Sequence, residues 1–386
     1  MQKSPIDKTD PMPRYLQVRR VLEESVRSGQ YRPGSQLPGE RELAQQLQVS
    51  QMTVNKAILA LVNDGWLRRE IGKGTFVSDG FRPPLPAVLR IGFAVPTTAE
   101  VAQEDFYLGS LLRGIQRAVT NAPVSLTLLE TPTDSLYERL IEAPVDGFLL
   151  TDVLDRCLDD VQRLAQAGRK MVILGADREP LHVPFVDSDN YGGARAAVEH
   201  LLSLGHRRIA GVFAYSGSCN TRHRLRAYQE TLRAHGIAAP PEYTLTFGNI
   251  YPLLEPVHAQ VTQLLSRTPR PTAFFCGGYY LALEAMKAVQ EAGLCLPDEV
   301  SVVGFDDPVT ARYLSPPLTT VHQPLEEMGR HATLELLDWL RTHEEPPLRT
   351  VLPATLRVRG TTAPPAADAP PPSEEPHSPT TPPTER

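Results

Sequence analysis

The sequence has little of what secreted and membrane proteins need. Its 386 residues include four cysteines and two tryptophans. The cysteines, Cys157, Cys219, Cys276 and Cys295, stand far apart and form no CxxC pair, which excludes a disulfide framework and the common zinc motifs. No apolar run approaches the ~18 residues of a membrane span, and Met1 to Asp10 carry no apolar signal-peptide core. We therefore expect a cytoplasmic chain with no membrane partner, no metal and no cofactor.

Charge is unevenly distributed along the chain. The net charge is −6, but residues 1–80 contain 12 Lys and Arg against 9 Asp and Glu, whereas the remaining residues contain 27 against 36. A basic segment joined to an acidic one suggests a nucleic-acid module attached to another domain. The expected parts are an N-terminal arm (1–12), a first domain (13–80), a Pro-rich linker (81–87), a second domain (88–360) and a disordered Pro-rich tail (361–386).

The first domain has the pattern of three helices followed by a hairpin. Helical periodicity covers residues 14–28 and 39–47, and Ser50 is placed to cap a third helix that buries Val54, Ala57, Ile58 and Leu61. The turn Gly72-Lys73-Gly74 suits a hairpin. This order predicts a winged helix-turn-helix whose third helix enters the major groove. A small helical oligomerisation domain would show the same periodicity.

The motifs favour DNA binding. The strings from Pro33 to Ala44, from Val49 to Ala57 and from Gly65 to Val77 resemble the GntR family of bacterial regulators. The resemblance implies that DNA is contacted by Arg41 on the second helix, by Gln51, Met52, Thr53, Asn55 and Lys56 on the third, and by Gly72, Lys73 and Gly74 in the wing. The family often has Arg at the positions of Gln51 and Asn55. Because Gln and Asn favour adenine where Arg favours guanine, we expect a different operator.

The second domain alternates short apolar runs with amphipathic stretches. Runs such as Leu89–Val95, Ile209–Phe213 and Val300–Phe305 are typical of buried parallel strands. The fold class is therefore α/β, with doubly wound parallel sheets in two lobes and a ligand cleft between them. G-x-S-x-G, H-E-x-x-H and G-x-G-x-x-G are missing. A metal at Asp306-Asp307 is disfavoured, because adjacent side chains of an extended segment point apart.

Longer strings identify the family of this domain. The segments Leu89 to Pro96, Glu199 to Ala210 and Pro297 to Asp307 resemble the LacI/GalR effector domain, whose fold is periplasmic-binding-protein-like. The resemblance implies an effector pocket that contains Asp105, Tyr107, Arg224, Tyr279, Asp306 and Gln323. Each polar residue of this set also has an alternative role as a surface group or a link between lobes. Gly277-Gly278-Tyr279 replaces the usual Ala-Asn-Asp, which indicates an effector that is smaller, more apolar or differently oriented.

Together the two halves predict a transcriptional regulator. The layout resembles that of the arabinose repressors of Gram-positive bacteria. It implies a homodimeric repressor that binds double-stranded operator DNA under the control of a small-molecule effector, with a sugar or related metabolite favoured. The alternatives are a regulator or architectural protein that responds to a non-sugar ligand or to none, and a fusion to an aminotransferase-like enzyme. Since catalytic signatures are missing, we expect no enzymatic activity.

Overall fold

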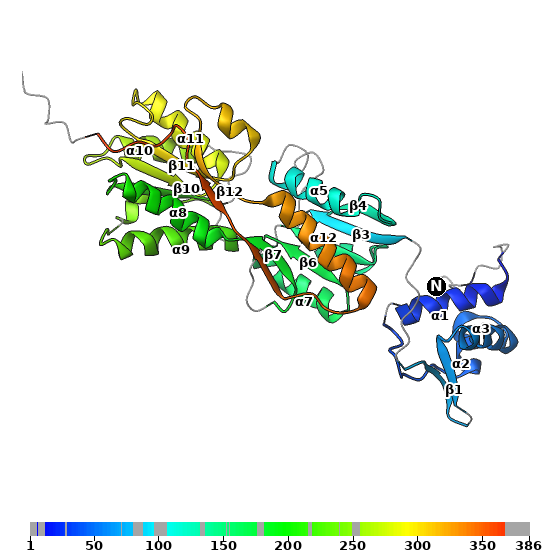
Figure 1. Cartoon of the computed structure of the whole chain (residues 1–386). Coiled ribbons are helices and arrows are strands. Elements are labelled where there is room, and N and C mark those ends of the chain that lie inside the picture. The colour runs from blue at the N-terminus through cyan, green and yellow to red at the C-terminus, as the bar shows by residue number, and fades with distance from the viewer. Residues whose placement is uncertain are drawn as a thin grey trace, which may run out of the picture. The chain divides into compact units, whose positions relative to one another are not determined.

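The chain forms two compact units whose main boundary lies between Leu89 and Arg90. The computed structural model (Figure 1) describes residues 6, 12–27, 29–70, 72–79, 88–95, 106–131, 136–151, 153, 155–175, 181–214, 218–238, 240–248 and 255–366. The expected linker, Asp105 and most of the expected arm and tail lie outside these ranges. Each unit is described by itself.

The first unit contains three helices and a hairpin. The helices are α1 (Arg14–Arg27), α2 (Glu40–Leu47) and α3 (Gln51–Asn63), and the strands are β1 (Leu67–Glu70) and β2 (Gly74–Val77). The Ser50 hydroxyl accepts a hydrogen bond from the Thr53 amide at 3.2 Å and so caps α3, as predicted. The predicted face of α3 is buried against α1, α2 and the hairpin. The winged helix-turn-helix is therefore confirmed.

The wing is braced by the segment that precedes α2. Strands β1 and β2 pair antiparallel from Leu67 opposite Val77 to Glu70 opposite Gly74. Gln36 bridges to Phe76 and donates its side-chain amide to the Lys73 carbonyl at 2.7 Å. A Cβ at Gly74, where φ is 123°, would lie 2.6 Å from that amide nitrogen. Glycine is thus required at this end of the turn for conformational and steric reasons.

The second unit begins with a lobe built on a six-stranded sheet of order β13-β7-β6-β5-β3-β4. Its strands are β3 (Leu89–Val95), β4 (Val124–Glu130), β5 (Gly147–Thr151), β6 (Met171–Leu174), β7 (Phe185–Ser188) and β13 (Arg349–Leu352). The pairs from β3 through β5, β6 and β7 to β13 are parallel. The helices of this lobe are α5 (Phe106–Val119), α6 (Leu136–Ile141), α7 (Leu158–Gln166) and α12 (Leu325–Thr342), with the short η1 (Asp155–Cys157).

Two glycines allow α5 and α12 to pack backbone against backbone. A Cβ at Gly114 would lie 1.9 Å from the Glu326 carbonyl oxygen, and a Cβ at Gly329 would lie 2.3 Å from the Leu111 carbonyl oxygen. Any larger residue at either position would push the two helices apart. The start of α5, which carries Phe106 and Tyr107, is therefore fixed relative to the chain that enters α12.

The second lobe has a sheet of order β14-β12-β11-β10-β8-β9. Its strands are β8 (Ile209–Phe213), β9 (Thr244–Thr246), β10 (Ala273–Cys276), β11 (Ser301–Phe305), β12 (Thr319–His322) and β14 (Thr355–Arg357), and only β14 pairs antiparallel. The helices are α8 (Asn190–Ser203), α9 (Cys219–Ala234), α10 (Glu255–Leu265) and α11 (Tyr279–Glu291), with η2 (Pro241–Tyr243) and η3 (Val309–Tyr313). The neighbours Phe274 and Phe275 enter two different cores, so both faces of the sheet are covered. The predicted doubly wound fold is confirmed.

Within the described residues, the chain passes between the lobes three times. The passages run from β7 into α8, from β12 into α12 and from β13 to β14 (Figure 1). They bring segments that are far apart in sequence to one place, around Ser188, Gln323 and Ala354. Ligand sites in α/β proteins form beyond the carboxyl ends of such strands. In the described part of the chain, no helix is both long enough and apolar enough to cross a bilayer.

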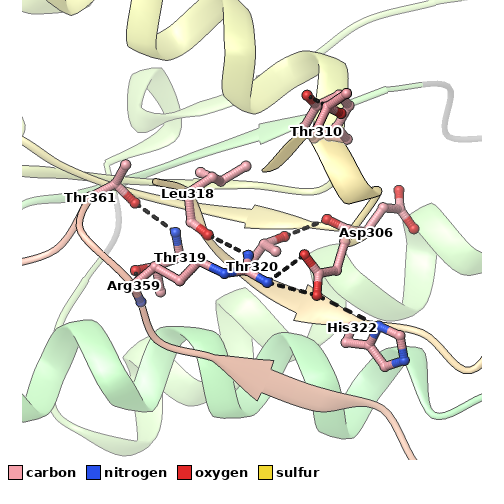
Figure 2. Close-up of polar contacts among 10 residues, drawn as sticks. Asp306, Thr310, Leu318, Thr319, Thr320, His322, Arg359 and Thr361 are labelled. Carbon is pink, nitrogen blue, oxygen red and sulfur yellow. Dashed lines mark hydrogen bonds and ion pairs between the residues drawn. The ribbon is translucent and has the colours of Figure 1, made fainter. Parts of the chain in front are cut away.

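The packed part of the second lobe extends beyond the expected boundary at residue 360. Thr361 is fully buried: its carbonyl accepts a hydrogen bond from the Val302 amide at 2.8 Å, and its hydroxyl accepts one from the Thr319 amide at 2.9 Å (Figure 2). The Ala363 carbonyl lies 2.9 Å from Nε2 of His206. The start of the tail was therefore placed too early, because the Pro-rich composition concealed a short segment that hydrogen-bonds to strands.

Candidate functional site

The first turn of α3 presents an exposed surface. Gln51 is exposed, and Met52 is 81% exposed although its side chain is apolar. Thr53 is half-buried, with its hydroxyl 2.7 Å from that of Ser50. Arg41 on α2 is exposed. These residues are accessible to a partner, and an exposed methionine suits contact with a thymine methyl group.

Asn55 lies in a network that the sequence analysis missed. Its side-chain amide donates to the two carboxylate oxygens of Glu40 at 3.0 and 3.1 Å, and Arg69 of the wing forms an ion pair with the same carboxylate. Glu40 thus joins α2, α3 and β1. Bidentate reading of adenine requires the amide group, which in Asn55 is hydrogen-bonded to Glu40. Glu40 and Asn55 both belong to the strings that resemble the GntR family. They are 15 residues apart in the sequence, so their contact depends on the fold.

Lysine side chains flank this network. The ammonium group of Lys56 on α3 lies 4.1 Å from the centroid of the Tyr15 ring, a cation–π contact that links α3 to α1. Lys73, at the tip of the wing, is 73% exposed and lies 3.1 Å from the Glu70 carboxylate. Such an exposed ion pair is weak. The Lys73 ammonium can therefore exchange Glu70 for a phosphate.

Arg224 is the centre of the second candidate site. It is buried on α9; its Nε donates to the Asn190 amide oxygen at 2.8 Å and one terminal nitrogen donates to the Gly277 carbonyl at 2.7 Å. The guanidinium carbon lies 3.7 Å from the centroid of the Phe305 ring. Burial lowers the pKa of Arg224, whereas the nearby Asp306 and Tyr107 act to raise it. The guanidinium remains charged, and an opposing charge or hydroxyl groups are needed to compensate its burial.

Asp306 and Gln323 meet beside this arginine. The Gln323 side-chain amide donates to Asp306, and its oxygen accepts a hydrogen bond from the Ser188 hydroxyl. The backbone of Asp306 has φ of 77°, and its carbonyl accepts a 2.6 Å hydrogen bond from the Thr320 hydroxyl (Figure 2). Asp307 instead pairs with Arg359 at 2.8 Å. The two neighbouring carboxylates therefore have different partners, and Asp306 is the one in the cluster.

The aromatic residues of the predicted pocket occupy different positions. The Tyr107 hydroxyl lies between the lobes, close to Gly175, where a Cβ would lie 2.3 Å from it and 3.5 Å from the Asn220 amide nitrogen. Tyr279 is buried, and its hydroxyl lies 2.8 Å from that of Thr310. The Tyr279 ring contacts Phe106, with centroids 5.9 Å apart. The Tyr279 hydroxyl is therefore already hydrogen-bonded, and its ring packs against an aromatic neighbour.

The structure brings four of the predicted effector residues together: Tyr107, Arg224, Asp306 and Gln323. The Tyr279 ring packs against Phe106, which precedes Tyr107 in the chain. Asp105 lies outside the described residues. These groups are positioned by Asn190, Ser188, Phe305 and the Gly277 carbonyl, none of which was predicted as a site residue. Asn190 lies outside the segments quoted for the family resemblance, and its role depends on α8 and α9 packing side by side.

Two protein-family models match this chain, one in each of the two units. Residues 14–77 match the family described as bacterial regulatory proteins, gntR family. Residues 198–362 match the periplasmic binding protein-like domain. The chain is 29% identical over 354 residues to the arabinose metabolism transcriptional repressor of Geobacillus stearothermophilus, an alignment that covers 86% of this chain and 93% of the relative.

Two further comparisons concern regulators named CelR. The chain is 34% identical over 265 residues to the HTH-type transcriptional regulator CelR of Thermobifida fusca, covering 66% of this chain and 76% of the relative. Among solved structures, a complex of the transcriptional regulator CelR with cellobiose superposes with a TM-score of 0.65 at 27% identity, covering 81% of this chain and 92% of that one.

Proposed function

The chain belongs to the transcriptional regulators that join a gntR-family DNA-binding domain to a LacI-type, periplasmic-binding-protein-like domain, and we propose that a sugar-like effector, held between the lobes, controls its affinity for operator DNA. It is a DNA-binding protein of the repressor type. The buried Arg224, which has Asp306 and Gln323 beside it, carries the effector proposal.

We assign contacts with the DNA bases to the first turns of α3. Contacts with the DNA phosphates are assigned to residues beside this helix and in the wing. Gln51 and Met52 are exposed and Thr53 is half-buried at the start of the helix, and Asn55 becomes a reader after it leaves Glu40. Arg41 and Lys56 provide charge beside the helix, and Lys73 with Gly72 and Gly74 forms the wing. Phosphate contacts of this kind position a protein, whereas contacts to base edges specify the sequence.

For the effector, the polar groups match a polyhydroxylated molecule. A guanidinium group suits paired hydroxyl or carboxylate oxygens, and the Asp306 carboxylate can accept hydrogen bonds from hydroxyl groups. Tyr107 offers a ring and a hydroxyl at the other lobe. The relatives support a sugar, since one is named for arabinose metabolism and another was solved with cellobiose. A non-sugar ligand remains the second candidate, favoured by the composition of one wall of the cleft.

That wall lacks the usual polar side chains. A Cβ at Gly277 would lie 2.9 Å from the Phe213 ring, so Phe213 excludes a side chain there. A Cβ at Gly278 would meet only Leu281, at an ordinary 3.7 Å. Phe106, Tyr279 and Tyr280 pack nearby with centroids 5.4 to 6.2 Å apart. We infer an effector with hydroxyls on the Arg224 side and an apolar face toward these rings.

For assembly, we propose a homodimer in the cytoplasm, where its DNA is found. One winged module reads few base pairs, and paired half-sites require two. Effector binding then acts by closing the lobes and altering how two DNA-binding domains fit an operator. A coupling free energy of roughly 1–3 kcal/mol changes operator occupancy about 5–150-fold. The bound effector regulates and is not converted, so we propose no enzymatic activity.

The test begins with a thermal-shift screen of pentoses, hexoses, polyols and nucleosides on the full chain. Selected operator DNA is then titrated with and without each stabilising compound. Arg224→Ala should bind DNA as the parent does and lose the ligand response, whereas Lys73→Ala should retain the response and lower the slope of affinity against salt by about one. A parent protein that no compound stabilises would favour an architectural role, and absorbance near 400 nm would favour the enzyme fusion.

A further inference from the structure

A cavity of about 360 Å³ lies in the second unit beside the Arg224 cluster. Its walls come from the passage between β7 and α8, from the first turns of α9 and from strand β13. None of Tyr107, Arg224, Asp306 and Gln323 lines it. The lining residues are mostly polar: Asp187, Ser188, Asp189, Asn190, Tyr191, Cys219, Arg222, His223, Arg226, Arg349 and Val351.

The acidic residues of this cavity are compensated by their own segment. Asp187 accepts hydrogen bonds from the Ser188 amide at 2.7 Å and from the Asn190 side chain at 3.1 Å. Asp189 caps α8 by accepting the Gly192 amide at 2.7 Å. Hydrogen bonds of this kind stabilise the negative charge of the two carboxylates. The carboxylates therefore repel an anionic ligand in the cavity only weakly.

The arginines, by contrast, have exposed partners. Arg222 pairs with Asp155 at 2.9 Å, with both side chains nearly half exposed, and Arg226 lies 3.8 Å from Glu230 with 61% of its side chain exposed. Arg349 and His223 add two more basic groups on the cavity wall. Exposed ion pairs contribute little to stability. A ligand with several charged oxygens can therefore replace these carboxylates and be bound by more than one guanidinium fork at once.

The orientation of α9 favours the same kind of ligand. This 16-residue helix begins at Cys219, which lines the cavity, and Ser218 before it makes no side-chain capping hydrogen bond. A helix N-terminus carries a partial positive charge and stabilises an anion placed near it. We propose that this cavity binds a small metabolite that carries a phosphate group, as a second ligand distinct from the effector in the cleft.

Such a ligand would act on the effector site through two shared residues. Asn190 lines the cavity and accepts the hydrogen bond from Arg224, and Ser188 lines it and donates to Gln323. Contacts that order this passage also order the two side chains that hold the effector. The cavity is thus placed to report a second metabolite to the same regulator. Its occupancy does not depend on the identity of the effector.

The experiment measures Tm and calorimetric binding on the full chain without DNA or effector. The probes are inorganic phosphate and glycerol 3-phosphate, with glycerol and sodium chloride at matched ionic strength as controls. Both phosphate probes should raise Tm in a saturable manner, whereas glycerol and chloride should not. The Arg226→Gln/Arg349→Gln variant should bind the phosphate probes at least tenfold more weakly, and the single Arg226→Gln variant several-fold.

Two control variants locate the site. Arg195→Gln removes an exposed arginine of α8 that pairs with Glu199 and does not line the cavity. Lys73→Ala removes a charge from the DNA-binding unit. Both should bind the phosphate probes within twofold of the parent. No saturable phosphate response, a response that survives in the double variant, or one lost in Arg195→Gln or Lys73→Ala would each overturn the proposal.

Discussion

Nε of Arg224 on α9 donates a 2.8 Å hydrogen bond to the side-chain oxygen of Asn190 on α8, and both residues are buried. Asn190 in turn donates to Asp187 and to the Ser188 carbonyl, each at 3.1 Å. Residues of the passage between the lobes therefore orient Arg224. Because α8 and α9 both belong to the second lobe, the hydrogen bond between Asn190 and Arg224 fixes the guanidinium relative to that lobe.

Asn190→Ala should weaken the effector response more than it weakens folding. Loss of the acceptor leaves a buried charged donor without its partner and lets Arg224 turn, so we expect effector affinity to fall about ten- to a hundredfold. The free energy of unfolding should fall by about 1–3 kcal/mol. Isothermal titration and denaturant unfolding measure the two effects.

Tyr191→Phe is a suitable control for this variant, because the Tyr191 hydroxyl donates a 2.7 Å hydrogen bond to Glu230 on the surface, away from Arg224. It should bind the effector as the parent does. An Asn190→Ala protein with unchanged effector affinity would show that Asn190 does not position Arg224.

Asn55 and Glu40 should have opposite effects on DNA recognition. Asn55→Ala removes the reader and should relax the preference at one or two base pairs. Glu40→Gln weakens the contacts that hold Asn55 and Arg69, and it removes a negative charge near DNA, so affinity should rise for most sequences. Selection from random DNA, followed by titration at several salt concentrations, distinguishes the two results. An identical selected motif for the Asn55→Ala variant and the parent would exclude Asn55 as a reader.

Gly278→Asn should change effector preference without loss of stability. Gly278 is the N-cap of α11 with extended backbone (φ −173°) and no side-chain cap, so Asn fits sterically and can stabilise the helix by a few tenths of a kcal/mol. An amide beside the cleft should favour ligands with a hydroxyl at that end over those with an apolar substituent. Affinities for a sugar and for its phenyl glycoside measure this preference.

Gly277→Ala provides the contrast to this variant, since its Cβ would meet the Phe213 ring at 2.9 Å. It should unfold at lower denaturant concentration than the parent. If Gly278→Asn left the ratio of the two affinities unchanged, Gly278 would not form part of the effector site.

The sequence was sufficient for features that local rules determine. The Ser50 cap, the buried face of α3 and the alternation of apolar strands with helices follow from spacing alone. The contact of Asn55 with Glu40 and that of Arg224 with Asn190 could not be predicted, since each depends on how two helices pack. Tyr279 shows the same limit: its position in the chain was known, but the orientation of its hydroxyl toward Thr310 depends on η3. The predicted start of the disordered tail at residue 361 was too early, because composition does not reveal the few hydrogen bonds that hold Thr361 to the sheet.

His206 should make the stability of the second lobe depend on pH. Its ring bridges Thr272, Ser301 and the Ala363 carbonyl at 2.9 to 3.1 Å, and so holds the segment after Thr361 to the sheet. Burial lowers the pKa of His206 below its ordinary value of 6.5, although the Ala363 carbonyl acts to raise it. The folded protein thus binds this proton less readily than the unfolded chain does, so stability is fully present above the ordinary pKa and is lost as pH falls below it. Unfolding free energies of the parent and His206→Gln, measured from pH 7.5 to 5, should converge toward low pH. Parallel curves would show that another group is responsible for the acid sensitivity.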